Sequence, residues 1–348
     1  MRLIVLGILM VFAASCSKQQ ADRDGATEIK LNTSIEKSAS KAVVQGNVFP
    51  DGSTLGLFVY HSELGSDGQI RPLANYEPYG TRYKNIRAYF ANSTKGWQFR
   101  FESSSTSFED VFLIEPPAIY SQSKQITLVS YAPWIQGCTN IKSVPVTLGG
   151  DSRQATDLMW ARENCTVGNS IEPDGEDKII NLHYKHALSL LKINIKCKHD
   201  VSVMKVNSIT LKKKENGTTE LYGKGSLNAI DGTFNPFKNE DRSTAITVNY
   251  EQEDIKFSSQ NIAQLPIMIF PTEYHTDGDY ILEFTFNGET LAATYPIKMQ
   301  DIKIGNETAF KQGYSYTFNF TFNNYMLIDN VKVNVDETWT PHNHELQF

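Results

Sequence analysis

Alternation of apolar and polar side chains, with a period of two residues, constrains the fold of this chain more than any other feature. In the clearest run, residues 314–322, every even-numbered position is aromatic and every odd-numbered position is polar. Successive side chains of a β-strand point to opposite faces, so this run predicts a strand with one buried face. Similar runs predict further strands at residues 280–286 and 331–335, and less regular runs of the same period predict strands at residues 55–60, 97–101, 126–131 and 206–211.

Turn signals and aromatic content extend this pattern over most of the chain. Aromatic residues make up 11% of the sequence, and Asp-Gly and Asn-Gly pairs separate many of the runs. One such pair, Asn287-Gly288, lies between two apolar runs and favours a tight hairpin. Helical spacing occurs only in an ambiguous patch at residues 182–193, whose second half alternates. The sequence therefore predicts an all-β protein.

The N-terminus resembles a lipoprotein signal. Residues 1–15 hold one basic residue and an apolar run of about twelve residues, too short to cross the ~30 Å hydrocarbon core of a bilayer. Such a segment is typical of a signal peptide that is removed. Cys16 follows Ala13-Ala14-Ser15 as in a bacterial lipobox, where the thiol is acylated. An ordinary secretory signal followed by an unmodified cysteine is the alternative.

A polar stretch with two glycines at residues 167–177 divides the 348-residue chain near its middle. Both parts are long enough to bury a core of their own. We therefore predict a lipidated tether at residues 16–27, an N-terminal domain at 28–170 and a C-terminal domain at 171–348.

Charge and cysteine content narrow the range of partners. The net charge is −6 and no basic stripe is present, so nucleic acid is not expected as a partner. Three cysteines remain after Cys16, an odd number without a Cys-x-x-Cys pair, so the sequence does not indicate a disulfide framework. One bridge between Cys138 and Cys165 stays open, and Cys197 would then have no partner.

Motifs for catalysis are absent from the sequence, which has no Gly-x-Ser-x-Gly elbow, no phosphate-binding loop and no His-Glu-x-x-His. We predict a protein that is not an enzyme and that uses no cofactor and no metal. His183 and His186 could share a zinc ion on a helix, but on a strand their spacing sends the two rings to opposite faces. One surface histidine and one core histidine are therefore expected.

Four phrases occur in order along the chain. They are a strand ending in Tyr-x-Pro-aromatic at residues 126–134, an Asp-Leu-hydrophobic-aromatic-Ala phrase at 156–161, a His-Ala-Leu element at 182–188 and a Gly-x-x-Tyr strand at 310–318. Together they resemble the fimbrillin (Mfa-like) family, type V pilus subunits of certain anaerobic Gram-negative bacteria. The resemblance covers nearly the whole mature chain and implies two tandem transthyretin-like Greek-key β-sandwich domains.

The resemblance also implies a route of assembly. A subunit of that family is exported as a lipid-anchored precursor, an outer-membrane trypsin-like protease removes an N-terminal strand, and another subunit's C-terminal strand fills the groove. Main-chain hydrogen bonds and alternate side chains would hold the added strand. The implied partners are other pilus subunits, the processing protease, the outer membrane through lipid and a ligand on a host surface. The implied location is the cell surface, in the fimbrium.

The removable strand is predicted at residues 29–35, where side chains of one parity would face the core: Ile29, Leu31, Thr33 and Ile35. Cleavage must follow this strand, and the basic residues available there are Lys37 and Lys41. The family commonly presents Arg at this place, so the chain departs from its pattern. A strand that is retained would suit a subunit that stays lipid-anchored at the base of a pilus.

The donor strand is predicted near the C-terminus, where apolar side chains share one parity: Leu327, Val331, Val333 and Val335. Each fully buried aliphatic side chain contributes ~1.5–3 kcal/mol, so three or four would hold subunits together. The alternative is that both segments are edge strands of a monomer.

Two further functions stay open from the sequence. The chain could be a pilus anchor or tip subunit, or a cell-surface lipoprotein that binds glycans or host ligands without polymerising. Glycan binding would use exposed aromatic side chains, for which the candidates are Trp97, Trp134, Trp160 and Trp339.

Overall fold

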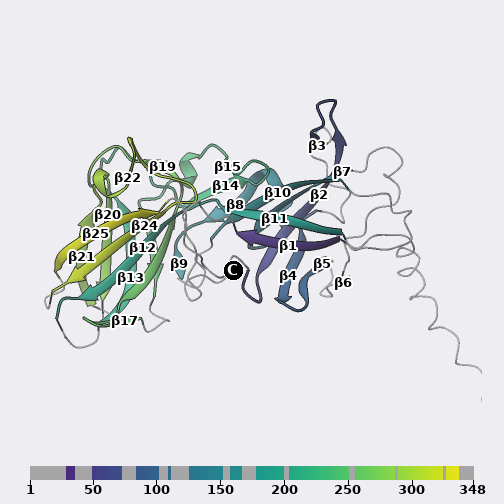
Figure 1. Ribbon diagram of the computed structural model, residues 1–348. Helices are drawn as coiled ribbons and strands as arrows, with labels where there is room; N and C mark the ends of the chain where they lie inside the picture. The colour runs from purple at the N-terminus through teal and green to yellow at the C-terminus, as the bar shows by residue number, and fades with distance from the viewer. Residues whose placement is uncertain are drawn as a thin grey trace, which may run out of the picture.

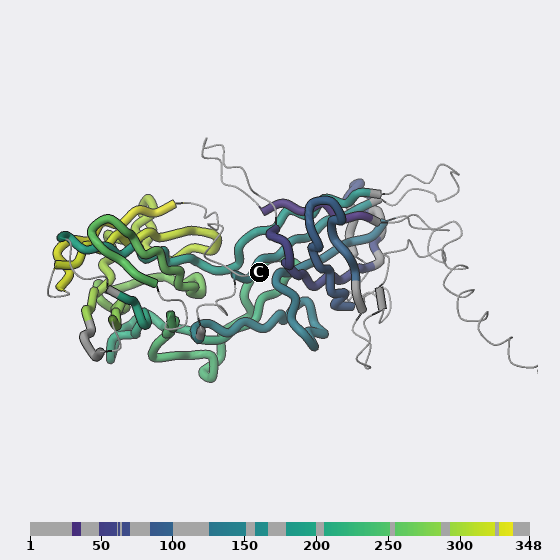
Figure 2. The backbone as a smooth tube through the Cα atoms, turned by 90° about the horizontal axis from the view of Figure 1, so that it is seen from below, coloured from purple at the N-terminus to yellow at the C-terminus, as the bar shows by residue number. Residues whose placement is uncertain are grey.

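All regular structure in the described part of the chain is β-structure. The computed structural model describes residues 29–35, 49–72, 84–101, 109–110, 125–151, 157–166, 178–199, 204–250, 255–286, 289–323 and 327–336. These residues form strands and three short 3-10 turns, η3 (Ile141–Ser143), η5 (Asn239–Asp241) and η7 (Met299–Asp301), and they contain no α-helix. The all-β prediction is confirmed. Two β-rich halves lie end to end in an elongated molecule (Figures 1 and 2).

One nine-stranded sheet forms the N-terminal half. Its order is β1-β11-β10-β7-β2-β4-β5-β6, and β3 pairs with β2. The sheet curls until β1 comes close to β5, where Trp97 Nε1 donates to Thr33 Oγ1 at 3.0 Å. The strands are β1 (Ile29–Ile35), β2 (Thr54–Leu64), β3 (Ile70–Pro72), β4 (Ile86–Asn92), β5 (Gly96–Phe101), β6 (Glu109–Asp110), β7 (Gln125–Ala132), β10 (Met159–Thr166) and β11 (Lys178–His186).

Strand β2 is buried on both faces. Leu55, Leu57 and Val59 point into the core that the curled sheet encloses. Phe58 and Tyr60, of the opposite parity, belong to a different core on the outer face. A strand covered on both sides reads as a continuous apolar run, which explains why alternation is weaker here than near the C-terminus.

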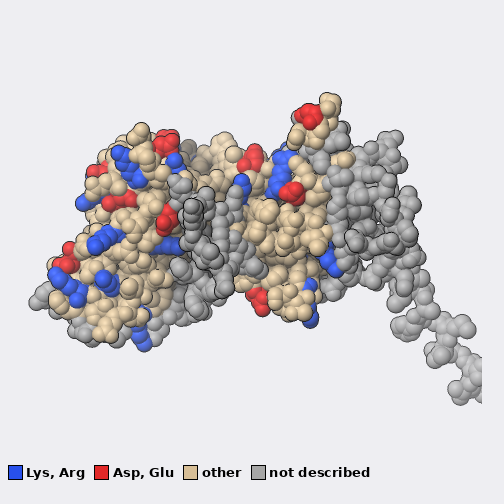
Figure 3. Space-filling view, in the orientation of Figure 1, with Lys and Arg blue, Asp and Glu red and all other residues tan. Residues whose placement is uncertain are grey.

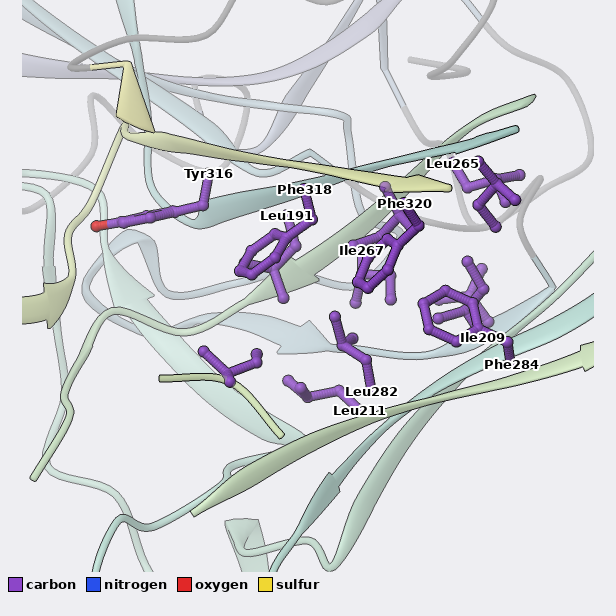
Figure 4. Close-up of a cluster of buried hydrophobic side chains, with 14 of the residues drawn as sticks. Leu191, Ile209, Leu211, Leu265, Ile267, Leu282, Phe284, Tyr316, Phe318 and Phe320 are labelled. Carbon is purple, nitrogen blue, oxygen red and sulfur yellow. The ribbon is translucent and has the colours of Figure 1, made fainter. Parts of the chain in front are cut away.

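Two facing sheets form the C-terminal half, which is a β-sandwich. Their side chains interdigitate between the sheets (Figure 4). The ring centroids of Phe284 and Phe320 lie 4.8 Å apart. The four-stranded sheet has the order β18 (Ala263–Ile269), β12 (Ser189–Cys197), β24 (Ser315–Phe322) and β25 (Ile328–Asp336). The six-stranded sheet has the order β21 (Glu289–Pro296), β20 (Tyr280–Phe286), β13 (Met204–Lys213), β16 (Ala245–Asn249) and β9 (Gly150–Asp151), with β17 (Lys256–Phe257) on β13.

Two small sheets complete the described structure. One has the order β15 (Thr233–Phe234), β14 (Lys224–Asn228) and β8 (Val144–Thr147). The other has the order β19 (Thr272–Glu273), β23 (Glu307–Phe310) and β22 (Lys303–Ile304). Strands β8 and β9 precede β10 in the sequence but pair with β14 and β16, so this segment reaches across to the C-terminal half.

The strongest strand predictions are confirmed. β20 alternates between buried and half-buried residues over its whole length, and β24 has the predicted aromatic side chains buried from Tyr316 to Phe322. The ambiguous patch at residues 182–193 forms the end of β11 and the start of β12.

Sheet pairing locates the passage between the two halves. β11 pairs with β10 in the N-terminal sheet, whereas β12 pairs with β18 and β24. The chain therefore changes sheets at Ala187 and Leu188. The predicted boundary at residues 170 and 171 lies outside the described residues and stays a prediction.

A third core joins the two halves. It combines side chains of β2 and β7 with others of β12, β14 and β18, among them Phe58, Val129, Leu190, Leu227 and Met268. Trp160 of β10 is half-buried against this core and lies over Gly232. Gly232 follows β14 and has a φ of +78°.

We expect Gly232→Ala to destabilise this junction, because an added Cβ would overlap the indole of Trp160. Overpacking of this kind costs about 1–3 kcal/mol. Gly137→Ala is the matched control, since its φ of +71° carries the same backbone strain but its Cβ would meet nothing within 4 Å. Chemical denaturation of both variants checks the difference. Equal losses of unfolding free energy would contradict a tight contact at Gly232.

Candidate functional site

Strand β1 forms one edge of the N-terminal sheet. It is paired along its full length with β11, from Ile29 opposite Lys178 to Ile35 opposite Tyr184. The two strands are parallel, whereas the other described pairs in this sheet are antiparallel. One partner strand and a few side chains therefore hold the first described element of the chain.

Three side chains of β1 point into the enclosed core, and we call them the acceptor row: Leu31, Thr33 and Ile35. Thr33 and Ile35 are 9% and 7% exposed, and Leu31 is partly buried against the same core. The side chain of Ile29, the fourth predicted member of this parity, lies outside the described residues. Beneath the acceptor row lie the buried side chains Phe49, Ile180, Leu182 and Tyr184.

Polar contacts hold β1 on both faces. On the outer face, Asn32 Nδ2 donates to Asn181 Oδ1 at 2.7 Å, and Ser34 Oγ lies 2.6 Å from His183 Nδ1. On the inner face, the only polar side chain of the acceptor row, Thr33, accepts the bond from Trp97. Below the row, burial raises the pKa of Tyr184, whose hydroxyl donates to Ser130 Oγ at 2.5 Å. The floor of the core is therefore uncharged.

Strand β25 is an edge strand of the C-terminal half, antiparallel to β24. Val331, Val333 and Val335, which we call the valine stripe, are partly buried against the sandwich core. The intervening residues are exposed, including Lys332 and Asn334.

Leu327 does not join the valine stripe as its parity predicted. Its side chain is 62% exposed, and its backbone carbonyl accepts a hydrogen bond from the backbone N–H of Asn323 in the turn before β25. The pairing with β24 shifts register between Thr321 and Phe322, so that Ile328 packs on the core in its place. A β-bulge resets the parity of a strand, and the sequence pattern does not show it.

Three predicted processing residues lie outside the described residues: Cys16, Lys37 and Lys41. They stay predictions, as does the lipid anchor. No helix in the described part of the chain is long and apolar enough to span a membrane.

The two histidines of β11 lie on opposite faces, as expected for a strand. His183 is exposed, whereas His186 is buried and its Nδ1 lies 2.8 Å from Asp157 Oδ2. The described residues contain no cluster of His, Cys, Asp and Glu that could hold a metal ion. No disulfide joins Cys138, Cys165 and Cys197, and all three thiols are buried.

The described tryptophans are all half-buried. Trp97 packs its ring against Phe49 and Phe90, at centroid distances of 5.4 and 5.1 Å, and Trp134 lies under the guanidinium of Arg87 at 4.9 Å. Trp160 packs on the junction core. Trp339 lies outside the described residues. The rings of Trp97, Trp134 and Trp160 therefore serve packing and do not form an exposed platform. Lys and Arg are interspersed with Asp and Glu over the described surface shown in Figure 3.

Sequence reasoning missed the buried pair of Asp157 and His186, which are 1% and 4% exposed. Each residue belongs to one of the four phrases singled out above, and the structure brings these phrases together. Trp160 of β10 is the strand partner of Tyr131 of β7. The backbone N–H of Ala187 donates to the carbonyl oxygen of Leu158 at 2.8 Å. The backbone N–H of Gly313 donates to the carbonyl oxygen of Leu188 at 2.9 Å, which connects the fourth phrase to the other three. The phrases therefore form the junction between the halves rather than either edge strand.

Comparisons with known proteins agree with this architecture. The model of the fimbrillin-like family matches residues 42–340. A proposed cell adhesion protein from Bacteroides ovatus has a similar structure, with a TM-score of 0.58, 16% identity and coverage of 91% of this chain and 99% of that one. One from Bacteroides uniformis has a TM-score of 0.53, 16% identity and coverage of 91% and 100%. At 16% identity, these two likenesses show the fold alone. No curated protein matches the chain.

We expect Thr33→Lys to loosen β1, because it places an ammonium in a position that is 9% exposed. Burying a polar group without a partner costs about 2 kcal/mol or more. Asn32→Lys is the matched control, since Asn32 is exposed on the same strand. Hydrogen exchange of the β11 amides measures the opening of β1. An equal loss of protection in both variants would contradict the importance of the inner face.

Proposed function

This chain belongs to the fimbrillin-like family, and from that premise we propose that it is a structural subunit of a surface pilus that acts in cell adhesion. It is exported as a lipoprotein anchored to the outer membrane through Cys16. It assembles when a protease removes β1 and a C-terminal strand of another subunit takes its place. The chain itself has no enzymatic role. Its partners are other pilus subunits, the processing protease and a ligand on a host surface.

The position of β1 is the observation that carries this proposal. A parallel edge strand that fills a core can be replaced by another strand of the same spacing. Loss of β1 would uncover the inward side chains of β11 together with Phe49, which lie in that core. An open edge above an apolar groove is prone to aggregation, so the vacated site requires a new occupant.

The order of segments along the chain supports removal of β1. Lys37 and Lys41 follow the strand directly in the sequence, before the next described residue, Phe49.

Strand β25 supports donation. It is an edge strand close to the C-terminus, it presents three valines of one parity, and these valines are only partly buried against its own half. An anchor subunit is the second candidate, favoured by one observation. The sequence between Arg23 and Arg71 contains no arginine, so a protease that requires arginine would leave β1 in place.

We expect lysyl endopeptidase to cleave the folded mature chain after Lys37 or Lys41 and SDS-resistant oligomers to follow. N-terminal sequencing locates the cut, and light scattering follows the mass. The double variant Lys37→Gln and Lys41→Gln is the control that should remain monomeric. Cleavage without oligomers would contradict strand exchange. Resistance at both lysines with a persistent monomer would leave the anchor, a tip subunit or a binding lipoprotein.

A further inference from the structure

The acceptor row and the valine stripe have the same spacing but different depths of burial. Both occupy three alternate positions of one strand with polar residues between them. Thr33 and Ile35 are 9% and 7% exposed, whereas the valines are only partly buried at their own edge. Because burial of apolar surface is favourable, valines placed at Thr33 and Ile35 of a vacated acceptor row would gain burial, which offsets part of the loss of the ladder between β25 and β24.

Resting on the strand exchange proposed above, we propose that the donor is a second copy of this chain and that its valine stripe fills the acceptor row in one register. In this register β25 runs parallel to β11, as β1 does. Val331 takes the place of Leu31, and the other two valines follow at the next two positions of the row.

Charged residues at the two ends of the stripe exclude the neighbouring registers. A shift of two residues in one direction would put Glu337 in the place of Ile35, which is 7% exposed. A shift in the other direction would put Asp329 in the place of Leu31, which packs on the same core. Burial of a carboxylate without a partner costs more than any one valine contributes. Among the parallel registers, the proposed one keeps the whole row apolar.

The outer face of the donor also fits this register. Lys332 would replace Asn32 opposite Asn181, and its ammonium can donate to the amide oxygen. Asn334 would replace Ser34 opposite His183, where its amide can bond to the imidazole. The donor would therefore replace both outer-face contacts of β1, the one to Asn181 and the one to His183.

Charge complementarity favours the parallel direction. One residue beyond the last pair, Asp336 of the donor would come opposite Lys185 of β11, which is exposed. The chain's own residue at that point of the sequence, Glu36, carries the same charge. An antiparallel donor would instead place Lys332 opposite His183 and Asp336 near the exposed Ile179.

One contact distinguishes β1 from the donor. Val333 would take the place of Thr33 and has no oxygen to accept the bond from Trp97 Nε1. This bond therefore adds to the stability of the unprocessed chain and is lost on exchange. Trp97→Phe is expected to speed the release of β1 without weakening the final complex.

Cross-linking between two proteins tests the register. The donor carries Asn334→Cys together with Lys37→Gln and Lys41→Gln, so that it keeps β1, and the acceptor carries His183→Cys and is digested with lysyl endopeptidase. A short bifunctional thiol reagent is expected to join them at least ten-fold more than it joins the same donor to an Asn181→Cys acceptor. Preference for Asn181→Cys would overturn the proposed register and direction.

The formation of an SDS-resistant complex is read separately. Absence of any complex overturns strand exchange itself, whereas a complex without the expected cross-link overturns the register alone. As a second test, Val333→Asp in the donor should reduce the complex at least ten-fold, and its outward neighbour Lys332→Asp should leave it near the parent level. Melting temperatures verify that both donors are folded. Equal complex with both donors would overturn the role of the valine stripe.

Discussion

Strand β11 requires a neighbour on its outer side, and much of the architecture follows from this requirement. Its inward side chains Ile180, Leu182 and Tyr184 are at most 3% exposed, and its backbone forms a ladder along the whole length of β1. Hydrogen-bonding groups and apolar side chains left open at such an edge are unfavourable in water. In the proposed exchange, the same requirement that stabilises the unprocessed chain would favour a partner strand of the correct spacing in place of β1.

The junction determines how such replacements could propagate. Side chains from both halves share one core, and the four family-like phrases meet there through backbone bonds and the buried pair of Asp157 and His186. β1 lies in one half and β25 lies in the other (Figure 1). A contact between two different surfaces of identical subunits is heterologous, and it generates an open fibre when the rotation does not close. A shared core that fixes the halves would give each added subunit the same geometry.

The sequence predicts well what depends on neighbouring residues and poorly what depends on distant ones. Alternation located β1, β20 and β24 because a pleated strand imposes its period directly on the side chains. Contrary to the prediction from its parity, Leu327 does not share the face of the valine stripe, because a bulge inserts a residue without a sequence signal. The bond between Trp97 and Thr33 joins residues 64 positions apart, so no local pattern indicates it.

Specificity in the proposed exchange arises from exclusion as much as from attraction. Three valines alone would slide along a groove, because an apolar row accepts apolar side chains in several registers. Asp329 and Glu337 end the row on either side, and each would carry an uncompensated charge into the core if the strand moved by one repeat. Outward side chains then distinguish direction through Lys185. A short stripe with charged ends is thus sufficient to define one geometry, which a longer apolar stripe would not.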